Sequence, residues 1–240
     1  MMRINKYLAA CGVVSRRKAD EFVLAGRVAV NSQIVDTPGL QIDEINDEVT
    51  LDKNPVKLIT DYTYLVLNKP AGYLTSRSDP HHNLVVTDLL KGVKERVNPV
   101  GRLDLDTEGV LLFTNDGEMA HRLSHPRYEI EKVYLALVKG RVTASELTRM
   151  AEGITLPDGA TGRADGEIVE EREDQTDLQL TLTEGRKREV KHLCSAIGHP
   201  VLFLRRLKFA GIMAGDLKIG SWRYLTVEET NSLRRQVKLL

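Results

Sequence analysis

Residues 99–117 read Pro99-Val100-Gly101-Arg102-Leu103-Asp104-Leu105-Asp106-Thr107-Glu108-Gly109-Val110-Leu111-Leu112-Phe113-Thr114-Asn115-Asp116-Gly117. Two glycines bound a charged segment, which leads into an apolar run over residues 110–114 that we expect to be a buried strand. The Asn-Asp-Gly triplet after the run predicts a turn. Loops held by a rigid scaffold are where binding and catalysis concentrate. We therefore expect the functional site on this charged segment, with Asp104 and Asp106 as the first candidates.

The two carboxylates do not by themselves indicate a metal site. Other ligands would have to join them, and the adjacent histidines His81 and His82 show no spacing typical of metal binding. A hydrolase acting on sugars needs two opposed carboxylates, and two on one loop are poor candidates for that arrangement. The sequence also lacks a glycine loop of the kind that cradles phosphates. We expect no metal and no cofactor.

Strands and helices flank the charged segment on both sides. Apolar or alternating runs predict strands at residues 64–67, 132–138 and 178–182. Thr143 with Glu146 and Thr226 with Glu229 form capping boxes, which predict helices from Ala144 to Glu152 and in the last segment. Apolar residues at helical spacing predict a further helix from Arg188 to Ile197, ended by Gly198. The short acidic cluster at residues 170–174 is expected to be a solvated loop. These elements favour an α+β domain with a mostly antiparallel sheet.

The N-terminal segment differs in scale from the rest. Apolar residues at helical spacing predict a first helix at residues 4–11, Ser15 is a candidate N-cap for a second helix, and Gly26 ends it. Residues 28–35 predict a hairpin that turns near Asn31-Ser32. A polar, proline-containing stretch follows, so we place a boundary near residues 54–60. The expected domains are 1–58 and 60–240.

Basic residues are clustered although the chain has 34 Lys plus Arg, 34 Asp plus Glu and a net charge of zero. Residues 1–27 hold six basic residues against two acidic ones. The six are Arg3, Lys6, Arg16, Arg17, Lys18 and Arg27. Cations at a helix start oppose its dipole, which favours a phosphate partner over a merely solvated basic helix, although that alternative stays open.

A second basic cluster lies between residues 186 and 208. Its seven basic residues, against Glu189 alone, are Arg186, Lys187, Arg188, Lys191, Arg205, Arg206 and Lys208. Two basic clusters on two domains indicate an extended polyanion as the partner. Few aromatic residues accompany them, so structured RNA with one extruded base fits better than an open single strand.

The remaining composition points to the cytoplasm. Cys11 and Cys194 have no paired-ligand spacing, and we interpret both as reduced thiols. No apolar run approaches the ~20 residues needed to cross a bilayer, and the first residues lack the hydrophobic stretch of a signal peptide. We expect no membrane partner.

Residues 99–117 closely resemble the signature of the ribosomal RNA pseudouridine synthases of the RsuA/RluB type. Three further segments resemble that family's motifs in the same order, and they are residues 67–72, 132–134 and 183–191. Residues 3–31 resemble the small RNA-binding domain named after the fourth small-subunit ribosomal protein. The resemblance implies an isomerase with the pseudouridine synthase fold, built on a long, mixed, largely antiparallel sheet and preceded by the small RNA-binding domain.

The resemblance also assigns roles to residues. Asp104 is the catalytic aspartate, Tyr134 packs on the target base, and Lys191 pairs with Asp104 where arginine is more usual. Arg102 organises the loop or binds phosphate, and a purely structural ion pair is the alternative. Arg186, Lys187 and Arg188 are expected on the RNA backbone, together with Arg3, Lys6, Arg16, Arg17 and Lys18.

The substrate follows less directly than the reaction. The segment Arg188-Glu189-Val190-Lys191 resembles the large-subunit members more than the small-subunit one, so we favour 23S over 16S ribosomal RNA. A catalytically silent RNA-binding assembly factor is the rival function, and the intact Gly101-Arg102-Leu103-Asp104 argues against it. We expect a monomer.

Overall fold

The computed structural model describes residues 1–81 and 83–239. The chain divides into two compact units, one formed by Met1–Tyr62 with Asn115–Gly117 and the other by Thr63–Thr114 with Glu118–Leu240. His82, which the sequence offered as a possible metal ligand, lies outside the described residues. No helix in the described part of the chain is long and apolar enough to cross a bilayer.

The first unit is a small helix-and-strand domain. Its elements are β1 (Met2–Arg3), α1 (Ile4–Ala10), α2 (Arg16–Leu24), β2 (Val28–Val30), β3 (Gln33–Val35), β4 (Gln41–Ile42), β5 (Val49–Leu51) and β6 (Asn54–Pro55). The Ser15 hydroxyl accepts a hydrogen bond from the Lys18 backbone and caps α2, as expected. Asn31 and Ser32 both have positive φ, which is the geometry of a tight hairpin turn between β2 and β3. Both sequence predictions are confirmed.

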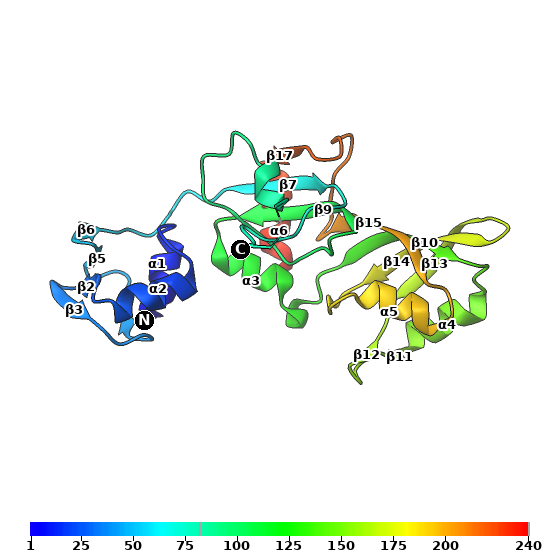
Figure 1. Ribbon diagram of the computed structural model, residues 1–240, viewed down its shortest axis with the longest axis horizontal. Coiled ribbons are helices and arrows are strands. Elements are labelled where there is room, and N and C mark those ends of the chain that lie inside the picture. Colours follow the sequence, from blue (N-terminus) through cyan, green and yellow to red (C-terminus); the bar gives the residue numbers. More distant parts are fainter. Residues whose placement is uncertain (82, 240) are drawn as a thin grey trace. The chain divides into compact units, whose positions relative to one another are not determined.

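The second unit is built on one large sheet. Its strands are β7 (Tyr64–Lys69), β8 (Asn98–Pro99), β9 (Glu108–Thr114), β10 (Lys132–Lys139), β13 (Asp165–Glu171), β14 (Gln175–Leu182), β15 (Val201–Phe209), β16 (Ile212–Met213) and β17 (Trp222–Tyr224). Their main order is β13-β14-β10-β15-β9-β7-β17 (Figure 1). β15 pairs in parallel with β9 and antiparallel with β10, so the sheet is mixed and largely antiparallel. The expected α+β class is confirmed.

Helices and short elements connect these strands. They are η1 (Val86–Leu89), α3 (Gly117–Ser124), η2 (Pro126–Tyr128), α4 (Ala144–Glu152), β11 (Ile154–Thr155), β12 (Thr161–Gly162), α5 (Glu189–Ala196) and α6 (Val227–Gln236). The capping boxes that begin α4 and α6 are present as predicted. α3 was not predicted, because its sequence begins with a glycine that looks like the end of the turn after β9.

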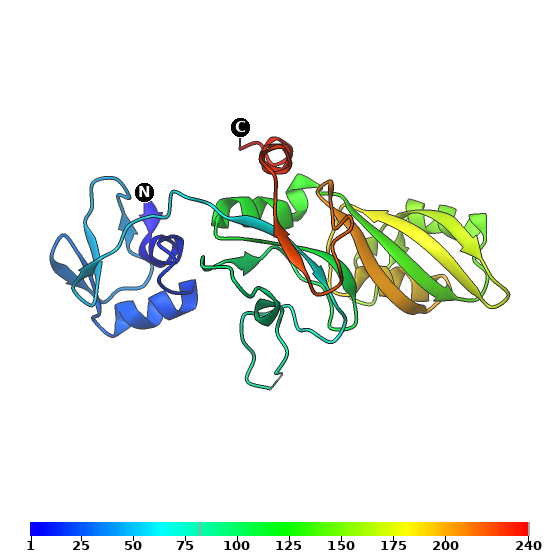
Figure 2. The same ribbon diagram turned by 90° about the horizontal axis from the view of Figure 1, so that it is seen from above.

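The core of the second unit has separate parts on the two halves of the sheet. Helices α4 and α5 lie against the half of the sheet that contains β10 and β14 (Figures 1 and 2). Apolar residues of these four elements form one core cluster. On the other half, side chains of β7 and β9 alternate. One set faces α3 and α6, and the other faces the segment between Tyr73 and Leu103. The packing of β7 and β9 against the segment between Tyr73 and Leu103 fixes the position of the charged loop that precedes β9.

Two sequence expectations about charged residues need correction. Glu170 and Glu171 belong to β13 rather than to a solvated loop, and Arg172 at the hairpin turn pairs with Glu170 and with Asp177. Residues 201–209, counted as part of a basic surface cluster, form the central strand β15. Leu204 and Phe209 of this strand are buried in two different core clusters, which a simple charge count does not reveal.

Candidate active site

The segment from Gly101 to Thr107, here called the aspartate loop, is held by a buried lysine. Lys69 ends strand β7 and is 0% exposed. Its ammonium donates hydrogen bonds to the carbonyl oxygens of Asp104 (3.1 Å), Leu105 (3.4 Å) and Thr107 (2.9 Å). Burial lowers the pKa of Lys69 to about 8, although the charges of Asp106, Glu108 and Asp104 oppose this shift. One side chain therefore fixes the backbone of three loop residues.

The other end of the aspartate loop is fixed by a threonine. The Thr75 hydroxyl donates to the Leu103 carbonyl at 2.7 Å and accepts from the Leu103 amide at 3.2 Å. The Gly72 amide donates to the Leu105 carbonyl at 2.7 Å. Backbone contacts on both sides of Asp104 therefore define the point from which its carboxylate projects.

Close packing between β9 and β15 follows directly after the loop. Gly109 has φ +103°, and a Cβ atom there would lie 2.2 Å from the carbonyl oxygen of Arg206. Only glycine allows this approach. Beside it, Glu108 accepts two hydrogen bonds from the Arg205 guanidinium. Arg206 is buried and donates to the Val110 carbonyl at 2.7 Å. Arg205 and Arg206 thus both have structural partners in the sheet, and Arg206 is buried away from any surface that could bind phosphate.

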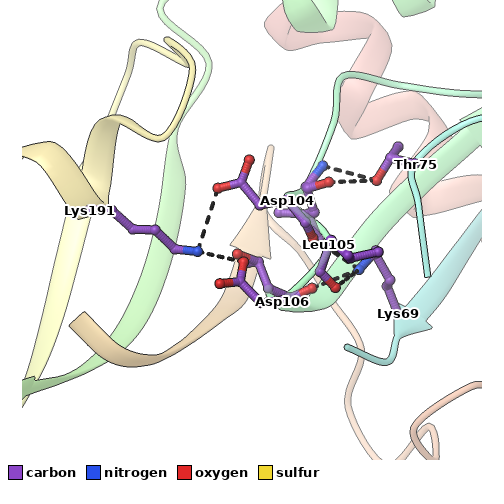
Figure 3. Close-up of polar contacts among 8 residues, drawn as sticks. Lys69, Thr75, Asp104, Leu105, Asp106 and Lys191 are labelled. Carbon is purple, nitrogen blue, oxygen red and sulfur yellow. Dashed lines mark hydrogen bonds and ion pairs between the residues drawn. The ribbon is translucent and has the colours of Figure 1, made fainter. Parts of the chain in front are cut away.

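The Lys191 ammonium lies beside both carboxylates of the loop (Figure 3). It comes from α5 and donates a hydrogen bond of 2.5 Å to Asp106, while Asp104 Oδ2 is 3.7 Å away. This hydrogen bond lowers the pKa of Asp106. Lys191 lies near Asp104, as the resemblance implied, but its shorter contact is with Asp106. The side chains of the two aspartates therefore point toward the same cation.

A pocket of about 590 Å³ opens at the aspartate loop. Its walls include Arg102, Asp104, Leu105, Tyr134, Glu184, Arg186, Lys187, Arg188 and Glu189. Tyr134 on β10 is half-buried and packs on apolar residues from both halves of the sheet. Glu189 is buried, and desolvation raises the pKa of its carboxyl. The pocket therefore combines an acidic loop, an aromatic wall and a basic rim.

The basic residues predicted to bind RNA are on the surface. Arg102, Lys187 and Arg188 are exposed at the pocket, and within the described residues Arg102 makes no ion pair. Arg186 is also exposed but pairs with Glu184 at 2.6 Å. In the first unit the exposed set is Arg3, Lys6, Arg16, Arg17 and Lys18. Of these, Lys18 pairs with Glu21 at 2.5 Å.

Possible metal ligands are dispersed in this chain. Across residues 1–81 and 83–239, no group of three or more His, Cys, Asp or Glu side chains is arranged to hold a metal ion. His81 is exposed on the loop before η1. Near the pocket, Asp106 is instead held by Lys191, Glu184 by the Arg186 guanidinium and Glu189 by the Arg186 backbone amide.

Comparison with known proteins identifies this arrangement. The family model described as RNA pseudouridylate synthase matches residues 63–196, and the S4 domain model matches residues 2–49. The chain belongs to the RNA pseudouridine synthase family. Members of this family are isomerases, so the RsuA/RluB-type resemblance and the enzyme class expected from the sequence are confirmed.

Relatives match this family member over nearly its full length. A protein of Aquifex aeolicus named an uncharacterized RNA pseudouridine synthase is 44% identical over 239 residues, which cover 99% of this chain and 96% of the relative. The ribosomal large subunit pseudouridine synthase B of Bacillus subtilis is 39% identical, with 98% and 96% covered. A crystal structure of a pseudouridylate synthase aligns with a TM-score of 0.71 at 29% identity and covers 97% of this chain and 100% of the other. The fold expected for the family is therefore confirmed.

Sequence reasoning missed Lys69 and Thr75 as parts of this synthase's site. Both lie outside the charged segment, and their partners are backbone atoms 28 to 38 residues away. A signal was present at Lys69, because this lysine closely follows the apolar run of residues 64–67, ends the strand and is followed by proline. A charged residue at the end of a buried strand needs polar partners, and the nearest polar segment is the aspartate loop.

Proposed function

We propose that this synthase isomerises one uridine of 23S ribosomal RNA, with Asp104 as the catalytic residue. The observation that carries the proposal is the Asp104 carboxylate, projecting from a doubly anchored loop into a pocket large enough for an extruded nucleotide. The name of the Bacillus subtilis relative supports the large-subunit substrate. A 16S target and a silent assembly factor are the alternatives.

The chemistry requires an anionic group beside the sugar. The reaction breaks the bond between N1 of uracil and C1′ of ribose, forms a bond from C5 to C1′, and moves one proton from C5 to N1. The isomerisation therefore consumes no co-reactant. Asp104 acts on the ribose as a nucleophile or as a base. The Lys191 ammonium lies 3.7 Å from this carboxylate.

The pocket walls suit a base that has left its stack. Extrusion costs a few kcal/mol in a duplex. The ring of Tyr134 offsets part of this cost by covering the uracil. The flanking phosphates are held at the rim by Arg102, Lys187 and Arg188. Arg186 also binds a phosphate once that phosphate replaces Glu184 as its partner. These roles follow the exposure and placement of each side chain.

The small domain supplies a second contact with RNA. We assign residues 1–58 to RNA binding and residues 60–240 to catalysis. The match to the S4 domain and the exposed arginines of α2 support this division. We propose that the protein acts in the cytoplasm as a monomer, since the RNA itself joins the two domains.

Mapping of pseudouridines tests the proposal. Total ribosomal RNA is compared from cells with the gene, without it, and with Asp104→Asn. Loss of one 23S site in both the deletion and the variant is expected. Loss of a pseudouridine from 16S RNA instead would show that 16S RNA is the substrate. A pseudouridine that is still formed in the Asp104→Asn cells would refute the catalytic role of Asp104. An unchanged map would favour the assembly factor.

A further inference from the structure

We propose that Asp106 is a positioning residue: it holds the Lys191 ammonium beside Asp104 without a hydrogen bond to the Asp104 carboxylate. This inference rests on the proposed catalytic role of Asp104. The Lys191 nitrogen is 2.5 Å from Asp106 Oδ1 and 3.7 Å from Asp104 Oδ2, which is beyond hydrogen-bond distance. The two carboxylates therefore share one cation unequally.

Asp106 is not needed to hold the aspartate loop. Lys69 and Thr75 anchor the backbone of that loop from the side opposite Lys191 (Figure 3). The side chain of Asp106 is 67% exposed, and exposed ion pairs contribute little to folding. Its position beside Lys191 therefore calls for another explanation than stability.

Lys191 needs a partner that Asp106 supplies. The Lys191 side chain is only 11% exposed, so its charge lies largely away from water. An ammonium in that setting hydrogen-bonds to the strongest acceptor within reach, which is a carboxylate. Without Asp106, the nearest carboxylate is Asp104. Asp106 thus accepts the hydrogen bond that Lys191 would otherwise donate to Asp104.

The surrounding charges keep Asp106 ionised in this role. Lys191 and then Arg188 lower its pKa, and Lys69 interacts electrostatically with both aspartates from β7. Glu184 and Glu189 are further carboxyls in the pocket wall, and Glu108 after the loop pairs with Arg205. Asp106 therefore remains a charged acceptor for the Lys191 ammonium.

The unequal sharing has a chemical consequence. A direct hydrogen bond from a cation occupies a lone pair of a carboxylate and makes that carboxylate a weaker base. At 3.7 Å, Lys191 makes no such hydrogen bond with Asp104. Asp104 then keeps its lone pairs for the ribose.

The test compares Asp106→Asn, Asp106→Glu and Asp104→Asn with the wild-type enzyme. Conversion of the transcribed ribosomal RNA that the wild type modifies is followed from pH 5 to pH 9 to obtain kcat and KM. In Asp106→Asn, Lys191 moves to Asp104, so kcat falls by about tenfold. The acid limb of the profile shifts to lower pH by roughly one unit. KM does not rise, since a negative charge has left an RNA-binding pocket, and Asp106→Glu restores most of kcat.

The controls separate this proposal from the assignment of Asp104. Glu173→Gln removes the same charge from the exposed β13–β14 turn and is expected to leave kcat and the profile unchanged. Activity in Asp104→Asn would refute the catalytic role on which the inference rests. With Asp104→Asn inactive, an unchanged kcat and profile in Asp106→Asn would overturn the positioning role. A raised KM with lowered thermal stability would show that Asp106 is structural.

Discussion

The Lys69 ammonium donates a hydrogen bond of 2.9 Å to the carbonyl oxygen of Thr107, two residues before the glycine at which β9 meets β15. The same ammonium reaches the carbonyl of Asp104. A side chain from β7 thereby sets the backbone path of a loop 35 residues later in the sequence. Positioning of the Asp104 carboxylate, which we propose to be catalytic, depends on a residue that does not project into the pocket.

Replacing Lys69 with methionine should damage activity more than folding. The substitution fills a similar volume but leaves buried carbonyls unpaired, which costs about 1–3 kcal/mol of stability at pH 7. A loop that is no longer fixed should lower kcat by about 100-fold, because misplaced catalytic groups are costly. Urea unfolding and pseudouridine formation measure the two effects. Wild-type kcat in a folded Lys69→Met variant would show that the loop keeps its shape unaided.

The buried charge of Lys69 should also make the stability difference depend on pH. Its pKa is about 8 in the folded protein and 10.5 for an ordinary lysine, so between these two pH values the unfolded chain binds more protons. Raising the pH through this window therefore stabilises the wild type relative to Lys69→Met by about 1.4 kcal/mol per unit. Lys132, whose pKa burial also lowers to about 8, is present in both proteins and cancels. Urea unfolding at pH 7.5 and 9.5 tests this, and a constant difference would contradict it.

Alanine at position 109 should be far more harmful than alanine at position 101. Both glycines have positive φ, which alone costs about 1–2 kcal/mol for alanine. At Gly109 the new methyl group also collides with the Arg206 carbonyl, whereas nothing lies within 4 Å at Gly101. We expect a loss of more than about 4 kcal/mol for Gly109→Ala, measured by chemical denaturation. Equal losses would mean that β9 and β15 separate easily.

The exposed arginines of α2 should contribute to RNA binding through phosphates. Removing both Arg16 and Arg17 should weaken binding and reduce the slope of log K against log salt by about 1.5, as two phosphate contacts are lost. Lys18→Ala is the matched control, because Lys18 already pairs with Glu21. The Lys18→Ala variant should reduce this slope by less than half of the reduction seen in the double variant. Filter binding at several salt concentrations measures this, and an unchanged slope in the double variant would place the RNA elsewhere.

Tyr134 should act through its ring and not its hydroxyl. Tyr134→Phe retains the surface that covers the uracil, so kcat/KM should stay within about threefold. Tyr134→Ala removes a stacking contact worth about 1–3 kcal/mol, which corresponds to a loss of about 5- to 150-fold. Thermal unfolding of both variants controls for packing, since Tyr134 also touches the core. A large loss in Tyr134→Phe would point to the hydroxyl instead.

Local signals in the sequence predicted local structure well. Ser15, Thr143 and Thr226 cap the helices that they were expected to begin, because a cap depends on residues within one helical turn. The turn at Asn31-Ser32 is set in the same way. Strand β15 was missed because its arginines were counted as surface charge. Only its neighbours in the sheet, far away in sequence, show that Arg205 has a carboxylate partner and that Arg206 is buried.

The candidate site was predictable as a set of residues but not as a geometry. Asp104, Tyr134 and Lys191 came from motifs; Asp104 and Tyr134 line one pocket, and Lys191 lies beside Asp104. Which aspartate receives the Lys191 hydrogen bond depends on how α5 packs against the aspartate loop. That packing joins residues 85 positions apart, and no local pattern encodes it.

Because β15 lies between β9 and β10, the order of synthesis has a consequence for when the enzyme becomes active. A nascent chain that has emerged as far as residue 200 contains Asp104, Tyr134 and Lys191, yet the two halves of its sheet have no strand to join them. All the residues that line the pocket, apart from Leu204 on β15 itself, are made before the pocket can exist. A ribosome translating this message thus releases an RNA-binding segment well before it releases a working catalyst.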